Sequence, residues 1–331
     1  MESVINGIDL DRVVSDVLDG KELDRNTARA IIEWPNDQLD ALLQATRRVR
    51  EAAFGRAVKL CMLRNAQSGI CPEDCGYCSQ SKASHADIPV YKMQTVDELI
   101  AGARQAVASG ARRYCMVCSM RGPAERDIEH LATACEKISD EFPELELCLS
   151  IGLLSRPQAE RLKQAGAGWI NHNLNTSREF YPSICSTHTY EDRLQTIENI
   201  RSAGLMTCAG GIVGMGETDE DIINLAYETR RLKLDSVPLN FLHPIAGTPL
   251  SEQRNLTPEK CLKIACLFRM LNPTSEVRAA GGRELNLGDR QADLFNAVNS
   301  VFVNGYLTTP GLDYIRTREI IERAGFEVEG Q

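Results

Sequence analysis

The sequence of 331 residues lacks any apolar run near the ~18 residues that a membrane-spanning helix needs. Its first residues, MESVINGIDLDRVVSDVLDG, are acidic and contain no long apolar stretch, so we expect neither a secretory signal nor a membrane anchor. An excess of basic charge is also missing, because the net charge is -9, and this argues against a broad nucleic-acid-binding surface. Low-complexity tracts and linkers rich in proline or glycine are absent too. We therefore predict one domain, residues 1–331, in a cytoplasmic protein.

Twelve cysteines are present, which in a long chain without a signal peptide indicates reduced thiols and metal ligands rather than disulfides. Three of them, Cys71, Cys75 and Cys78, lie in the stretch GICPEDCGYCSQS with C-x3-C-x2-C spacing and no fourth cysteine close by. Thiolates select zinc, copper(I) or iron–sulfur clusters, and structural zinc sites are usually closed by four ligands. Three thiolates on a cubane iron–sulfur cluster would leave one iron open to a small molecule. A zinc loop or free thiols is the alternative.

Helical patterns alternate with short strand patterns along most of the chain. Residues 95–110 have apolar side chains at helical spacing, with Thr95 as the expected N-cap and Gly110 as the expected stop. Further helices are expected at 126–143, 155–166, 190–204, 218–235, 257–273 and 290–298. The expected strands are 57–66, 111–119, 145–152, 167–174, 205–214, 236–244, 275–282 and 299–305.

Such alternation indicates an α/β fold with a parallel sheet, and about eight units in this length predict a (β/α)8 TIM-type barrel. An open, doubly wound sheet is the alternative. The barrel and a C-terminal tail would span residues 56–331. Residues 1–55 hold extra helices, including NTARAIIEWP and DQLDALLQATRRVREAAFG, which we expect to cap the bottom of the barrel or to form a subunit interface.

Several strands carry polar or sulfur-containing residues that would face the inside of a closed barrel, because side chains alternate along a strand. These residues are Arg113 and Cys115, Cys148, Asn171, Asn173 and Asn175, Cys208, Asn240, and Arg278. Barrel interiors are usually filled with branched apolar side chains, so a polar interior needs a ligand to satisfy it. The sequence therefore predicts a second, buried site beyond the three-cysteine loop.

The loop also carries an aromatic residue, Tyr77, directly before its third cysteine, and C-x3-C-x-aromatic-C resembles the radical S-adenosylmethionine (SAM) superfamily. With RYCMVCSMRGP, NHNLNTS, GGIVGMGET and NPTSEVRAAGGRE added, the chain closely resembles the biotin synthase family over roughly residues 40 to 328. The resemblance implies a sulfurtransferase that turns dethiobiotin into biotin after hydrogen abstraction at C9 and C6. It further implies an electron donor such as flavodoxin or ferredoxin, the iron–sulfur assembly machinery, and a homodimer.

The resemblance also implies two clusters. Cys71, Cys75 and Cys78 would hold a catalytic [4Fe–4S] cluster whose open iron binds SAM. A [2Fe–2S] cluster that supplies the sulfur would be bound by Cys115, Cys148, Cys208 and Arg278. An arginine ligand is unusual because a guanidinium has no acceptor, and chemistry alone would predict a fourth cysteine or a histidine. Cys118 is close to Cys115 but is expected on the opposite face of its strand.

By the same resemblance, Tyr77, Asn173, Asn175, Arg193 and Ile212 would bind SAM, and Asn171, Asn173 and Asn240 would bind the substrate. Ile212 belongs to GGIVGMGE, whose glycines allow close approach to the adenine. The family often has Asp at the position of Asn175, so here a neutral amide would contact the SAM ribose. Arg193 falls within an expected helix, where a solvated face is the alternative.

The other cysteines and the histidines have no ligand spacing. Cys61, Cys135, Cys185, Cys261 and Cys266 are expected to be core or surface thiols, and His172 is expected to pack. Two rival functions stay open: another radical SAM enzyme, which should lack the second set of ligands, and a zinc-stabilised binding scaffold.

Overall fold

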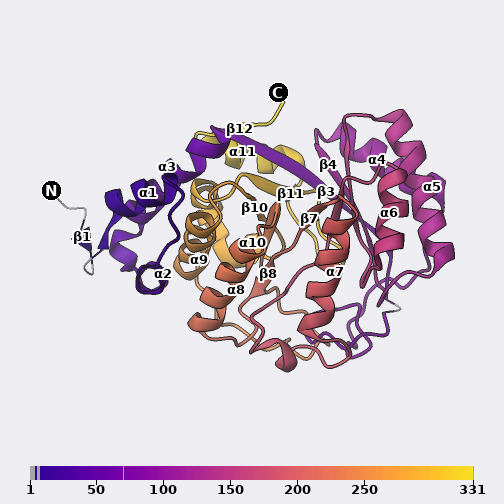
Figure 1. Ribbon diagram of the computed structural model, residues 1–331, viewed down its shortest axis with the longest axis horizontal. Coiled ribbons are helices and arrows are strands. Elements are labelled where there is room, and N and C mark those ends of the chain that lie inside the picture. The colour runs from indigo at the N-terminus through magenta and orange to yellow at the C-terminus, as the bar shows by residue number, and fades with distance from the viewer. Residues whose placement is uncertain (1–3, 6–7, 70, 331) are drawn as a thin grey trace.

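The computed structural model describes residues 4–5, 8–69 and 71–330, and its central element is a closed parallel barrel (Figure 1). The barrel closes because β10 pairs with both β9 and β11, and β11 pairs with the first barrel strand, β3. The predicted barrel is confirmed, and the open sheet is wrong. The strands are β3 (Ala57–Gln67), β4 (Arg113–Cys118), β5 (Glu146–Ser150), β6 (Trp169–Asn171), β7 (Met206–Cys208), β8 (Gly211–Val213), β9 (Ser236–Phe241), β10 (Glu276–Ala279) and β11 (Ser300–Val303).

The fifth strand position differs from the continuous strand expected at 205–214. It consists of β7 and β8, which both pair with β9 and are separated by Ala209 and Gly210. Gly210 packs so tightly that a Cβ built on it would lie 2.0 Å from the carbonyl oxygen of Pro238. The glycine therefore lets the backbone bend against β9, at the point where the strand enters the site end of the barrel.

Helices surround the barrel, and most begin where the sequence predicts (Figure 1). The capping box of Thr95 and Glu98 starts α4, and Gly110, with φ of +68°, follows its end. The outer helices are α4 (Val96–Ala108), α5 (Glu125–Glu141), α6 (Arg156–Gln164), α7 (Tyr190–Ser202), α8 (Asp219–Arg231), α9 (Pro258–Leu271), α10 (Arg283–Leu287) and α11 (Tyr314–Arg323). Short 3-10 helices are η1 (Asn36–Gln38), η2 (Tyr181–Ser183) and η3 (Gly288–Asn296).

The helix expected at 290–298 is instead the 3-10 helix η3, preceded by α10. Asn296 donates a side-chain hydrogen bond to the carbonyl of Asp293 at 2.8 Å, and Gln291 donates one to the carbonyl of Gly288 at 3.1 Å. Such local bonds compete with the regular α-helical ladder, which explains why the apolar spacing misled the prediction.

The N-terminal extension contains α1 (Leu10–Leu18), α2 (Arg25–Ile32) and α3 (Leu39–Phe54), which pack beside α8 and α9. A two-residue pairing of β1 (Val4–Ile5) with β2 (Ile8–Asp9) precedes them, and near the other end of the chain β12 (Glu327–Val328) adds to β3. The extension reaches the bottom of the barrel at Arg50, which donates to carbonyls of Ala57 and Val298. The other contacts of the extension are with the outer helices α8 and α9 and with η3. The predicted subunit interface is not tested.

Nowhere in the described residues does a helix have the length and apolar character needed to cross a membrane.

Candidate active site

The three-cysteine loop follows β3 at the carboxyl end of the barrel, as predicted. Cys71, Cys75 and Cys78 line a cavity of about 290 Å³ at this end. Short backbone hydrogen bonds shape the loop, among them the bond from Cys78 N to Cys75 O at 3.1 Å. Gly76 donates its N–H to the carbonyl of Ile184 at 2.8 Å, so the loop is docked on the segment between β6 and α7.

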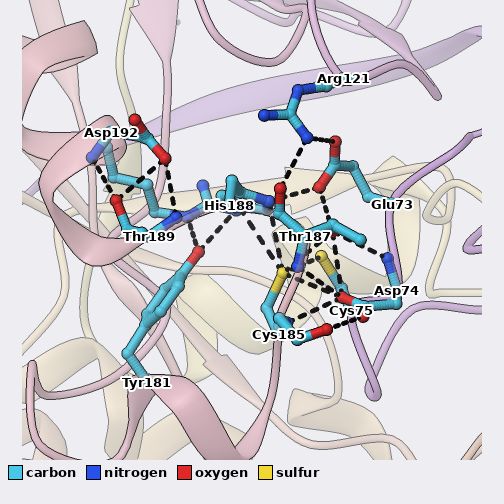
Figure 2. Close-up of polar contacts among 12 residues, drawn as sticks. Glu73, Asp74, Cys75, Arg121, Tyr181, Cys185, Thr187, His188, Thr189 and Asp192 are labelled. Carbon is cyan, nitrogen blue, oxygen red and sulfur yellow. Dashed lines mark hydrogen bonds and ion pairs between the residues drawn. The ribbon is translucent and has the colours of Figure 1, made fainter.

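Two acidic side chains of the loop fasten it to that segment (Figure 2). Asp74 Oδ1 accepts the backbone N–H of Ser186 at 2.9 Å and that of Thr187 at 3.2 Å. Glu73 Oε2 accepts the hydroxyl of Thr187 and lies 2.5 Å from Nδ1 of His188. Burial alone would raise the pKa of Asp74, but hydrogen bonds led by those of Ser186 hold it well below its usual value. The side chain of Asp74 is therefore an ionised carboxylate at neutral pH.

His188 is the centre of a buried polar cluster that the sequence did not predict (Figure 2). Its Nε2 lies 2.8 Å from the hydroxyl of Tyr181 and 2.7 Å from the guanidinium of Arg193. Its Nδ1 lies 3.3 Å from the sulfur of Cys185, which is 3.7 Å from the sulfur of Cys75. One ligand atom from each of Cys75, Cys185 and His188 falls within 4.8 Å of the others. Cys185 is a buried thiol, as expected, but its contacts with Cys75 and His188 were not predicted from the sequence.

Cys185 and Cys75 differ in how easily they ionise. Hydrogen bonding to Cys75, with further bonds from His188 and Thr187, lowers the pKa of Cys185 to about 4. The same sulfur–sulfur contact, together with burial, raises the pKa of Cys75. Cys75 borders the cavity and Cys185 does not, so Cys185 contacts the loop on the side that faces away from the cavity.

The cavity gathers every residue predicted to bind SAM or substrate. They are Tyr77, Asn171, Asn173, Asn175, Arg193, Ile212 and Asn240. Their proximity is a finding, while their individual roles stay predictions. Arg193 is on α7 but is only 8% exposed, and it donates to the carbonyl of Asn173 at 2.8 Å. The alternative of a solvated helix face for Arg193 is therefore wrong.

The asparagines are held by the backbone around β8. Asn173 Oδ1 accepts the N–H of Gly210 at 3.1 Å, and Asn240 donates to the carbonyl of Gly211 at 3.1 Å. Asn175 has φ of +71°, and its Nδ2 is buried without a hydrogen-bond partner among the described residues. His172, expected only to pack, also borders the cavity, and burial lowers its pKa so that it is neutral.

Deeper in the barrel, the four residues predicted for the second site lie on one inward-facing layer. Cys115 pairs in register with Cys148, and Cys148 is close enough to both Cys115 and Cys208 for hydrogen bonds that raise its pKa. Arg278 donates to the sulfur of Cys208 at 3.4 Å. The cavity reaches this layer, since Cys115 and Arg278 line it. Strand alternation therefore placed these side chains together correctly, and their role as ligands stays a prediction.

A buried ion-pair network forms the next layer toward the bottom of the barrel. Arg113 binds both carboxylate oxygens of Glu276 at 2.9 and 3.0 Å and also Glu146 at 2.7 Å. Lys59 lies 2.8 Å from Glu146 and 3.6 Å from Glu276. Arg113 does not border the cavity, because these carboxylates engage it from below the thiols.

The remaining cysteines divide into one interior thiol and several outer ones. Cys61 joins Cys115 and Cys148 in a small cluster inside the barrel, a position that the sequence analysis did not assign to it. Cys118 packs with Met93 in a separate core cluster, on the face opposite Cys115 as expected. Cys135, Cys261 and Cys266 are buried core thiols, and all twelve cysteines are free.

Two family models match this chain. The Radical SAM superfamily model matches residues 67–226, and the Biotin and Thiamin Synthesis associated domain matches residues 238–327. Among solved structures, methylornithine synthase (PylB) aligns with a TM-score of 0.83 at 20% identity, covering 96% of this chain and 97% of that one. The hydrogenase maturase HydG from Carboxydothermus hydrogenoformans aligns with a TM-score of 0.80 at 18% identity, covering 96% and 79%. At these identities the structures support the fold alone.

Curated relatives are much more similar. A biotin synthase of Geobacillus thermodenitrificans is 45% identical over 313 residues, which cover 95% of this chain and 94% of that protein. A biotin synthase of Thermus thermophilus is 46% identical over 312 residues, covering 93% and 94%. Such identity over nearly the whole length, together with both family models, means that this chain belongs to the biotin synthase family of the radical SAM superfamily.

Proposed function

We propose that this chain is a sulfurtransferase that converts dethiobiotin to biotin in a SAM-dependent reaction. The observation that carries the proposal is that one cavity joins two groups of sulfur, the three-cysteine loop and the interior layer. Membership of the biotin synthase family supports the choice of substrate. Another radical SAM enzyme would not need the interior thiols, and a zinc-stabilised scaffold would not need the polar cavity between them.

The loop fits a [4Fe–4S] cluster that keeps one iron open. Cys71, Cys75 and Cys78 border the cavity where the loop covers it, and thiolates are the ligands that such clusters require. Cys185 is next to Cys75 but does not border the cavity, because Asp74 and His188 engage it. We assign the open coordination position to the amino and carboxylate groups of SAM, and with it a catalytic role to the three cysteines.

The polar wall of the cavity fits SAM. The unpaired Nδ2 of Asn175 needs a buried partner, and a ribose hydroxyl provides one. Arg193 is fixed by Asn173 and His188, so its positive charge is held in place beside the loop. Tyr77 and Ile212 add apolar surface for the adenine. Because these groups are already ordered, little conformational entropy is lost when the cosubstrate binds.

The interior layer fits a second, [2Fe–2S] cluster, held by Cys115, Cys148 and Cys208 with Arg278 as the fourth group. Three buried thiols, of which Cys148 contacts the other two, form with the guanidinium beside Cys208 a soft-metal donor set with a compensating positive charge. Substrate would bind between the two groups of sulfur. Asn171 and Asn240 line that space, and their amides suit the ureido ring of dethiobiotin.

When bound, the loop cluster supplies the electron that cleaves SAM, and the interior cluster supplies the sulfur atom. The chain's own part is to align SAM and substrate between the two sites and to exclude water and oxygen. The cavity is small and the interior thiols are almost fully buried, both of which support that role.

Further assignments rest on the family rather than on contacts. They are one barrel domain over residues 1–331 with an N-terminal helical extension, a homodimer, a cytoplasmic location, an electron donor such as flavodoxin or ferredoxin, and the iron–sulfur assembly machinery.

The test is an anaerobic incubation of reconstituted protein with dethiobiotin, SAM and a reductant, read by mass spectrometry. We expect biotin together with 5′-deoxyadenosine. Production of 5′-deoxyadenosine without biotin would support the cleavage of SAM and would show that dethiobiotin is not the substrate. If protein that demonstrably carries iron and sulfide gives neither product, the proposal is wrong.

A further inference from the structure

His188 borders the cavity and is only 7% exposed, and both of its ring nitrogens already have partners within the chain (Figure 2). Its Nδ1 faces Glu73, whose Oε2 lies 2.5 Å away. Its Nε2 faces the hydroxyl of Tyr181 at 2.8 Å and a terminal nitrogen of Arg193 at 2.7 Å. Because neither nitrogen is free for a ligand, His188 can influence what binds in the cavity only through these neighbours.

The partners determine which nitrogen of His188 carries the proton. A guanidinium has only N–H donors, so Nε2 must offer its lone pair to Arg193. The proton of the neutral ring then lies on Nδ1, where the carboxylate of Glu73 accepts it and the sulfur of Cys185 is a second neighbour at 3.3 Å. A cationic ring would instead point an N–H at the guanidinium and place two positive charges in contact. The hydrogen-bond partners therefore assign the tautomer that is protonated at Nδ1.

Arg193 is held by the chain through each of its three nitrogens. Its Nε donates to the hydroxyl of Tyr181, one terminal nitrogen donates to Nε2 of His188, and the other donates to the carbonyl of Asn173 at 2.8 Å. Each terminal nitrogen carries two N–H groups, so each keeps one that has no acceptor among the described residues. Arg193 borders the cavity, and a guanidinium with N–H groups left on both terminal nitrogens can bind both oxygens of a carboxylate.

We infer that His188 is a positioning residue for SAM: oriented by Glu73, it holds Arg193 so that the guanidinium meets the carboxylate of the cosubstrate. The inference rests on the proposed function, because it takes Arg193 as part of the SAM site. Without an acceptor at Nε2, Arg193 keeps Tyr181 and Asn173 but loses the contact that fixes one of its two terminal nitrogens. The loss should therefore weaken binding of ligands that carry a carboxylate and should not affect binding of the adenosine part.

Two amide substitutions separate the two sides of the ring. In His188→Gln the amide reaches the position of Nε2, so its oxygen can still accept from Arg193. In His188→Asn the amide ends at the position of Nδ1, so it can still donate to Glu73 but does not reach Arg193. His130→Asn is the matched control, because His130 is a half-buried histidine on α5 whose Nε2 hydrogen-bonds the carbonyl of Gln94 away from the cavity.

Isothermal titration of the full-length, anaerobically reconstituted proteins with SAM and with decarboxylated SAM measures the dissociation constants. For His188→Asn we expect SAM to bind about tenfold more weakly, because a charge-assisted hydrogen bond is lost, and decarboxylated SAM to bind within about twofold of the unsubstituted protein. His188→Gln and His130→Asn should bind both ligands as the unsubstituted protein does. In the release of 5′-deoxyadenosine, His188→Asn should raise KM for SAM and leave kcat and the iron content unchanged.

Three results overturn the inference and leave the proposed function in place. Equal affinity of His188→Asn and His188→Gln for SAM would show that the acceptor at Nε2 does not matter. Equal weakening of SAM and decarboxylated SAM in His188→Asn would show that His188 only shapes the cavity. A fall in iron content and kcat without a change in KM would make His188 a structural support of the loop. If unsubstituted protein that carries iron and sulfide binds no SAM, the proposed function falls together with the inference.

Discussion

Arg113 and Glu276 meet inside the barrel through two parallel hydrogen bonds of 2.9 and 3.0 Å, one layer below the interior thiols. Arg113 has no exposed surface and Glu276 is 7% exposed. Lys59 and Arg278 face the same carboxylate, so Glu276 contacts three cations, two of which, Lys59 and Arg113, also pair with Glu146. This arrangement supports the layer above it, because the side chain of Arg278 is held by Glu276 while it reaches toward the sulfur of Cys208.

Glu276→Gln should destabilise the cluster-free protein by about 3–5 kcal/mol, because it leaves buried cations without their carboxylate. Chemical denaturation followed by circular dichroism measures this change in the free energy of unfolding. The control is Glu129→Gln, since Glu129 pairs with Arg161 on the protein surface, and such pairs contribute only about 0–1 kcal/mol. Equal losses in the two variants would contradict a structural role for the buried network.

Acid should destabilise the unsubstituted chain more than it destabilises Glu276→Gln. Burial alone would raise the pKa of Glu276, but Arg278, Arg113 and Lys59 hold it well below its usual value of 4.5. A carboxyl with a lowered folded-state pKa contributes stability that is fully present above about pH 4.5 and is lost as the pH falls further. The free energies of unfolding of the two proteins, measured by denaturation, should therefore converge as the pH falls from neutral to acid. Parallel curves would show that Glu276 does not titrate as described.

Asp74→Ala should weaken the hold of the loop on iron without unfolding the barrel. Asp74 fastens the loop to the backbone of Ser186 and Thr187, so its loss frees the cysteines to move. We expect iron to be lost to a chelator about tenfold faster, as is common when groups behind metal ligands are removed.

Asp192→Ala is the matched control for Asp74→Ala. Asp192 caps α7 through the N–H of Thr189 and does not contact the loop, so its loss should cost about 1 kcal/mol of stability and leave iron retention unchanged. If both variants lose iron equally fast, iron retention depends on overall stability rather than on the hydrogen bonds that Asp74 accepts.

Asn175→Asp should tighten SAM binding about fivefold, which corresponds to roughly 1 kcal/mol. Asn175 has φ of +71°, a conformation that Asp also tolerates, and its carboxylate could accept ribose hydroxyls that the unpaired amide nitrogen cannot accept. Isothermal titration of reconstituted protein with SAM measures the dissociation constant. Unchanged affinity would place the ribose elsewhere in the cavity.

The alternation of helices and strands along the chain made the barrel predictable, and the alternation of side chains along each strand made the interior layer predictable. Every second residue of a barrel strand faces the interior, and this rule placed Cys115, Cys148 and Cys208 inside the barrel. Cys61 was expected only as a core or surface thiol, and its place in the interior cluster with Cys115 and Cys148 depends on the registers of β3 against β4 and β11. Registers between strands so far apart in the sequence leave no local pattern.

The support behind the loop could not be predicted for a different reason. Glu73 and His188 are 115 residues apart, and Cys185 and Cys75 are separated by 110. Both contacts join irregular segments, where no periodicity fixes which side chains face each other. The contact between Cys185 and Cys75 therefore could not be predicted from the sequence.

The most direct test of the central claim is the ratio of biotin to 5′-deoxyadenosine formed by Cys148→Ala, compared with the unsubstituted protein and with Cys75→Ala. If the two groups of sulfur have separate roles in one cavity, Cys148→Ala should still release 5′-deoxyadenosine but should form no biotin, while Cys75→Ala should form neither. Biotin formation by Cys148→Ala in the same ratio as in the unsubstituted protein would contradict the account.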